Sequence, residues 1–146
     1  MKPSRFEDLK VWQLAHKLSL AVAKLVKDFP KDEKYDLSDQ MRRSARSIPS
    51  DISEGFGRYH YNDKLTFYER GRSSLGELRN HFKEALGNGY VVRTTYDKFT
   101  KNMSEVGFLL SRMMKNIQAA RDLPQSERKS KRPSSRRVTS NPRKVD

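Results

Sequence analysis

The chain contains no cysteine and no long uncharged run, and each absence excludes a class of protein. Without cysteine there is no disulfide framework, thiolate metal site or cysteine nucleophile. No uncharged stretch approaches the roughly 18 residues that a membrane span requires. The first residues have no apolar segment behind their basic side chains, so we expect no export signal, a cytoplasmic location and no membrane partner.

Acidic residues are also scarce relative to basic ones. The chain has 18 Asp and Glu against 31 Lys and Arg, which gives a net charge of +13. Residues 123–146 carry eight basic and two acidic side chains, so the remainder of the chain still carries +7. A body that is basic over its own surface attracts polyanions, and nucleic acid is the commonest of these. The charge therefore predicts nucleic acid as a partner.

The main pattern in the sequence is helical periodicity. Apolar residues recur at steps of three and four along 8–29, 36–57, 62–86 and from about 95 to the proline at 124. A chain of 146 residues has room for one core. Four helices with short links predict an all-α fold, an antiparallel up-and-down four-helix bundle over residues 1–123. Pro49 should bend the second helix without ending it.

Local signals give further expectations about the helix ends. Asp36 or Ser38 can accept the free amides that begin the second helix, and Asn62 or Asp63 those of the third. The apolar stripe of the fourth helix is expected to comprise Phe99, Met103, Val106, Leu110, Met113, Ile117 and Ala120.

Four residues exceed what a single bundle should need to bury. Gly71 and Gly76 each cost a helix interior about 1 kcal/mol relative to alanine, which predicts a close approach by another backbone. Phe108, together with the off-stripe methionine of the Met113-Met114 pair, suggests a second apolar contact outside the protomer. We therefore expect self-association.

Residues 124–146 have almost nothing apolar to bury, so the sequence predicts a disordered, basic C-terminal tail. Within it, Arg132, Arg136 and Arg137 are candidate phosphate contacts.

Lysines recur every seventh residue along the first helix, at Lys10, Lys17, Lys24 and Lys31. Such a ridge either tracks phosphates or is simply a solvated face.

Arginines flank the stripes of the next two helices. Arg42 and Arg46 lie one turn apart on the second helix, with Arg43 farther out and Asp39 able to pair with Arg42 or Arg43. On the third helix the edge residues are Arg72, Arg79 and Lys83. Contact with phosphate and contact with a neighbouring subunit both suit this edge.

Catalytic and metal patterns are weak. His16, His60 and His81 have no ligand-like spacing. Asp51 and Glu54 lie one turn apart, yet no Glu-x-x-His motif elsewhere completes a bundle-type metal site. We expect no enzymatic activity, no metal and no cofactor.

Several motifs resemble one family. They are Phe6-Glu7-Asp8-Leu9-x-x-Trp12, Phe29-Pro30-x-x-Glu33-x-Tyr35-x-Leu37-x-x-Gln40-x-Arg42-Arg43-Ser44-Ala45-x-Ser47-Ile48-Pro49, Ile52-x-Glu54-Gly55-x-x-Arg58 and Ser73-Ser74-Leu75-x-Glu77-Leu78. Over residues 6–120 the chain is similar to the four-helix-bundle proteins of intervening sequences in 23S rRNA genes. The resemblance implies a bundle protomer, a homopentamer and no demonstrated enzymatic activity. Asp51 and Ser53 stand where the family usually has Asn and Ala.

Two functions follow as hypotheses. The first is an oligomeric scaffold that binds RNA or DNA mainly through phosphates, because no base-reading motif is visible. The second rests on the resemblance, since relatives include accessory proteins of diversity-generating retroelements: a protein-interaction subunit for a reverse transcriptase.

Overall fold

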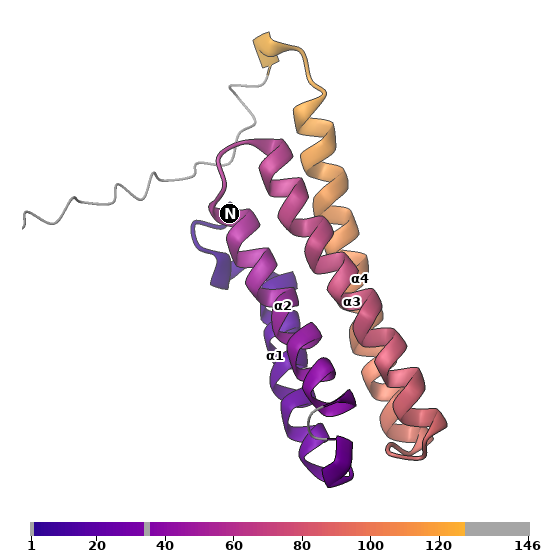
Figure 1. Cartoon of the computed structure of the whole chain (residues 1–146). Helices are drawn as coiled ribbons and strands as arrows, with labels where there is room; N and C mark the ends of the chain where they lie inside the picture. The colour runs from indigo at the N-terminus through magenta and orange to yellow at the C-terminus, as the bar shows by residue number, and fades with distance from the viewer. Residues whose placement is uncertain (1, 34–35, 128–146) are drawn as a thin grey trace, which may run out of the picture.

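The computed structural model describes residues 2–33 and 36–127, which form four long helices. They are α1 (Lys10–Leu25), α2 (Leu37–Gly57), α3 (Tyr61–Gly87) and α4 (Arg93–Arg121). Short 3-10 turns precede and follow α1 at η1 (Phe6–Asp8), η2 (Val26–Asp28) and η3 (Lys31–Glu33). Successive helices run up and down in alternation (Figure 1), and no described residue lies in a strand. The predicted all-α four-helix fold is confirmed.

Each helix packs against its neighbours in the chain, and α1 also packs against α4, which closes the bundle. Ala15, Val22, Met41, Ile48 and Val106 are among the core side chains with no exposed surface. Pro49 lies inside α2, and the helix continues through it as a single element. The residues after α4 from 128 onward, including the predicted tail contacts Arg132, Arg136 and Arg137, lie outside the described residues.

The first helix is shorter than its periodicity predicted. α1 ends at Leu25, and the chain tightens into η2 before Phe29 and Pro30. Val26, rather than Leu25, is the fully buried residue there. Lys31 falls in η3, beyond Pro30, so the heptad ridge of α1 comprises only Lys10, Lys17 and Lys24.

The starts of α2 and α3 differ from the prediction, because none of the expected residues caps its helix with a side chain. Asp36 occupies the N-cap position of α2 without a side-chain capping bond, and the hydroxyl of Ser38 is buried without a hydrogen-bond partner. Glu33 instead approaches the Leu37 amide, with Oε2 at 3.5 Å. His60 precedes α3, also without a side-chain capping bond, so Asn62 and Asp63 lie within the helix rather than at its cap.

The residues that exceeded the needs of one bundle have different environments in the structure. Met114 is buried within the protomer and Met113 is only partly buried, so the prediction that Met114 is off the stripe was wrong. A Cβ on Gly71 would lie 3.7 Å from the Ile48 carbonyl oxygen, so the backbone of α2 does pass this glycine, at an ordinary van der Waals distance that leaves room for a methyl group. Gly76 has nothing within 4 Å, and Phe108 is 66% exposed. Only Gly76 and Phe108 therefore remain unexplained by the protomer.

A lysine occupies the core stripe of α3. Lys64 is only 4% exposed, and its ammonium donates to the carbonyls of Gly55 (3.3 Å) and Phe56 (2.8 Å) at the end of α2. The Gly55 carbonyl also accepts a hydrogen bond from the Arg58 amide at 3.2 Å. The last carbonyls of a helix have no further turn to pair with, so Lys64 helps to close the end of α2 from the neighbouring helix. Burial lowers the pKa of this lysine.

Candidate nucleic-acid interface

The outer surface of α1 carries a row of lysines, which we call the α1 lysine face: Lys10, Lys17 and Lys24. All three side chains are exposed, because Val11, Ala15, Leu18 and Val22 turn the opposite face of the helix into the core. Successive lysines are seven residues apart, which is about 10 Å along a helix axis.

Within the described residues, no carboxylate forms an ion pair with these lysines. The sequence of α1 contains neither aspartate nor glutamate. A row of like charges without internal counter-charges holds mobile counterions, and their release on binding a polyanion favours association.

The arginines of α2 are placed differently. Asp39 is 3.2 Å from the guanidinium of Arg43 and 4.0 Å from that of Arg42, so this carboxylate contacts both, where the sequence suggested one or the other. Arg46 is exposed and has no ion pair among the residues that the structure describes. Of the three predicted contacts on α2, Arg46 is thus the one whose charge is not already offset.

The three candidate residues at the edge of α3 lie in different environments. Arg72 pairs with Glu69 at 2.6 Å on the same helix. The guanidinium of Arg79 turns to α4 and donates to the carbonyl of Met103 at 3.3 Å, a role within the protomer that the sequence did not suggest. Lys83 is exposed and lines, with Arg79, a hollow of about 310 Å³ between α3 and α4. No acidic residue lines this hollow: the others are Gly76, Asn80, Tyr96, Thr100 and Met103.

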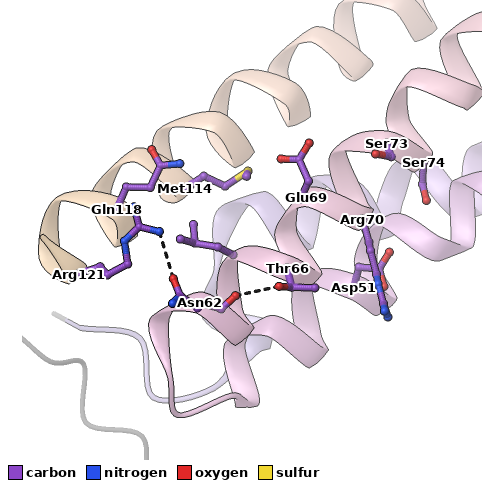
Figure 2. A pocket seen from close by; sticks show the side chains of 11 residues that line it. Asp51, Asn62, Thr66, Glu69, Arg70, Ser73, Ser74, Met114, Gln118 and Arg121 are labelled. Atoms are coloured by element: carbon purple, nitrogen blue, oxygen red, sulfur yellow. Dashed lines mark hydrogen bonds between the residues drawn. The ribbon is translucent and has the colours of Figure 1, made fainter.

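A second, broader hollow of about 850 Å³ lies over the first half of α3 and the end of α4 (Figure 2). Its charges are mixed and already engaged. Arg121 donates to Asn62 at 3.1 Å. Burial raises the pKa of Asp51, and the nearby Arg70 guanidinium opposes that shift. Two arginines and two carboxylates in one hollow give no surplus of positive charge, so this site suits a polyanion less well than the α1 lysine face.

Aromatic rings contact one another beside the α1 lysine face, and the sequence did not lead us to predict these contacts. The ring of His16 stacks on that of Trp12, with centroids 4.8 Å apart and planes inclined by 11°. Phe6 meets the edge of Trp12 at 5.1 Å. The signal was the spacing of Trp12 and His16, which at four residues apart share one helix face.

The described residues contain no group of three or more His, Cys, Asp or Glu side chains placed to hold a metal ion. Asp51 and Glu54 do influence one another, since Glu54 contributes to the raised pKa of Asp51, but Glu54 also pairs with Arg58 at 3.4 Å. No helix in the part of the chain that is described is long and apolar enough to cross a membrane.

Comparison with known proteins agrees with the motifs. The model of a family described as 23S rRNA-intervening sequence protein matches residues 7–112. The chain belongs to this family. A similar fold occurs in a protein of unknown function from the S23 ribosomal protein family of Bacteroides thetaiotaomicron, with a TM-score of 0.68 and 20% identity over 72% of this chain and 95% of that one. No curated protein matches the sequence. The relation to retroelement accessory proteins stays a prediction.

The structure gives a physical reason for one motif of this intervening-sequence family. In Ile52-x-Glu54-Gly55-x-x-Arg58, Ile52 has no exposed surface and Glu54 pairs with Arg58. A Cβ on Gly55 would lie 2.5 Å from the ring of Tyr68, which is itself buried. Gly55 therefore lets α2 approach α3 closely, Ile52 belongs to the core, and Glu54 and Arg58 pair along α2.

Proposed function

We propose that this chain is a non-enzymatic, oligomeric scaffold that binds nucleic acid, RNA in particular, through its phosphates. The observation that carries the proposal is the α1 lysine face, where three exposed lysines stand on a helix without a carboxylate. Such a surface binds phosphates whatever the base sequence. The family description, which names an intervening sequence of 23S rRNA, favours RNA over DNA.

The remaining candidates take secondary roles in this proposal. Arg46 and Lys83 add exposed charge on α2 and α3, while Arg42, Arg43, Arg72 and Arg79 have partners in the protomer. A surface ion pair is worth little and can be exchanged for a phosphate contact at small cost. The dominant contribution is nevertheless assigned to α1.

Lysine acetylation footprinting tests the proposal on the intact chain. The protein is treated with an acetylating reagent with and without an RNA oligonucleotide, and mass spectrometry gives the modification at each lysine. We expect the RNA to protect Lys10, Lys17 and Lys24, and the protection to vanish at high salt. The exposed α4 lysines Lys98, Lys101 and Lys115 are the internal control. Equal protection of both sets, or protection of the control set alone, would refute the assignment.

A further inference from the structure

Beside the α1 lysine face runs a second row on the same helix, which we call the aromatic row: Trp12, His16 and Leu20. These residues are spaced by four, so they follow one another along the helix surface. Leu20 is 59% exposed, so its apolar side chain is not used by the core. His16 is exposed as well, and Trp12 is partly buried.

The stacked rings of Trp12 and His16 are held in place by contacts of Trp12 with the core and with η1. Trp12 packs against the hydrophobic core, and Phe6 of η1 meets its edge at 5.1 Å. His16 lies nearly parallel to Trp12, at 11°, so one face of the imidazole is covered and the exposed remainder is presented to solvent. A ring fixed by such contacts loses little conformational freedom when another ring stacks on it.

The two rows are close enough to serve one ligand. His16 and Lys17 are consecutive residues, which places their side chains about 100° apart around the helix. Exposed Gln13 and Leu20 lie on the surface between them. A polymer that carries anionic groups along one edge and flat rings along the other fits this face: its phosphates meet the lysines while a ring stacks on His16.

We infer that α1 binds single-stranded nucleic acid, with an unpaired base stacked on the outer face of His16 and the adjoining phosphates on Lys10, Lys17 and Lys24. The inference rests on the proposed function and narrows it to strands whose bases are accessible. Stacking on an aromatic side chain tolerates every base, because each base has a π-face. A duplex keeps its bases stacked inside, so it can use only the lysines.

The test compares three ligands of equal length: oligo(dT), an abasic strand with the same phosphates, and a duplex. We expect His16→Ala to weaken binding of oligo(dT) by at least about fivefold, the lower end for one stacked base, and to leave binding of the abasic strand unchanged. His16→Phe should restore the affinity. The matched control is His60→Ala, which removes another exposed histidine and should change neither. An oligo(U) arm applies the same test to RNA, and its binding should weaken on His16→Ala as that of oligo(dT) does; RNA binding that ignores this substitution would overturn the inference for RNA.

The outcomes separate the inference from the proposed function. If His16→Ala leaves oligo(dT) binding intact, or weakens the abasic strand equally, the stacking inference is wrong while phosphate binding stands. A duplex that binds as tightly as oligo(dT) also overturns it. If none of the ligands binds the wild-type chain, the proposed function itself fails. Trp12 is the only tryptophan in the chain, so its emission checks that each variant keeps the native environment of the row.

Discussion

The phenol of Tyr90 donates a 2.7 Å hydrogen bond to Oε1 of Glu33, and so joins the loop between α3 and α4 to the segment that leads into α2. The ring of Tyr90 also contacts that of Phe29 at 5.5 Å. The second oxygen of Glu33 approaches the Leu37 amide, so one carboxylate serves both the loop and the start of a helix. These contacts tie one end of the bundle together.

The hydrogen bond between Tyr90 and Glu33 predicts that the folded state loses stability at alkaline pH. The hydrogen bond to Glu33 is the main cause that raises the pKa of Tyr90 to about 12. An unperturbed tyrosine titrates near pH 10, so the folded state holds this proton more tightly than the unfolded chain. The stabilisation is complete below about pH 10 and is lost as the pH rises through about 12. Tyr90→Phe should lower Tm at neutral pH, and its difference from wild type should shrink across that window. A difference independent of pH would contradict this account.

Lys64 predicts a loss of stability when its ammonium is removed. Lys64→Met keeps most of the apolar stem but leaves the carbonyls of Gly55 and Phe56 without this donor. We expect a cost of about 1–3 kcal/mol in the free energy of unfolding, measured by urea denaturation. Lys83→Met, an exposed lysine of the same helix, is the control and should change it by less than about 0.5 kcal/mol. An unchanged or stabilised Lys64→Met variant would mean that desolvation cancels the two hydrogen bonds.

Two glycines should respond with opposite sign to the same substitution. Gly55→Ala places a methyl group against the buried Tyr68 ring and should destabilise the fold by about 1–3 kcal/mol or more. Gly76→Ala meets nothing within 4 Å and should stabilise α3 by roughly 0.5–1 kcal/mol. Thermal unfolding followed by circular dichroism measures both. Equal effects of the two substitutions would show that the α2–α3 contact is looser than described.

Self-association is predicted to use the exposed Phe108 on α4. Light scattering at micromolar concentration should give a mass above that of one chain, and Phe108→Ser should lower it. Val92 is exposed to the same degree, and Val92→Ser is the control that should leave the mass unchanged. A monomeric wild-type chain would remove the oligomer from the proposed function, and an unaffected Phe108→Ser oligomer would place the contact elsewhere.

Heptad spacing predicted the helices because an apolar stripe must face the core whichever partners cover it. It misplaced Met114 for a geometric reason. A step pattern of 3.5 residues drifts from the 3.6-residue period of a straight helix, so after four turns from Phe99 the inward position passes from Met113 to Met114. Lys64 also fits the spacing of the α3 stripe, but a charged residue is not assigned to a core without sight of its partners.

Part of the candidate site depended on a contact between segments distant in sequence. Arg79 reaches the carbonyl of Met103, twenty-four residues away, and no local pattern carries that information. The start of α2 was missed within one local segment, because Glu33, four residues before Leu37, turns its carboxylate towards the Leu37 amide. The α1 lysine face was predictable, because Lys10, Lys17 and Lys24 need only a helix to align them and the sequence contains no acid between them.

The most direct test of the account is the slope of log affinity against log salt for RNA. The variant Lys10→Gln, Lys17→Gln, Lys24→Gln is compared with Lys98→Gln, Lys101→Gln, Lys115→Gln, which removes the same charge from exposed positions of α4. If each α1 lysine contacts a phosphate, the first variant loses roughly 2–3 units of slope and the second almost none. Equal losses in both variants, or none in the first, would contradict the assignment of phosphate binding to α1.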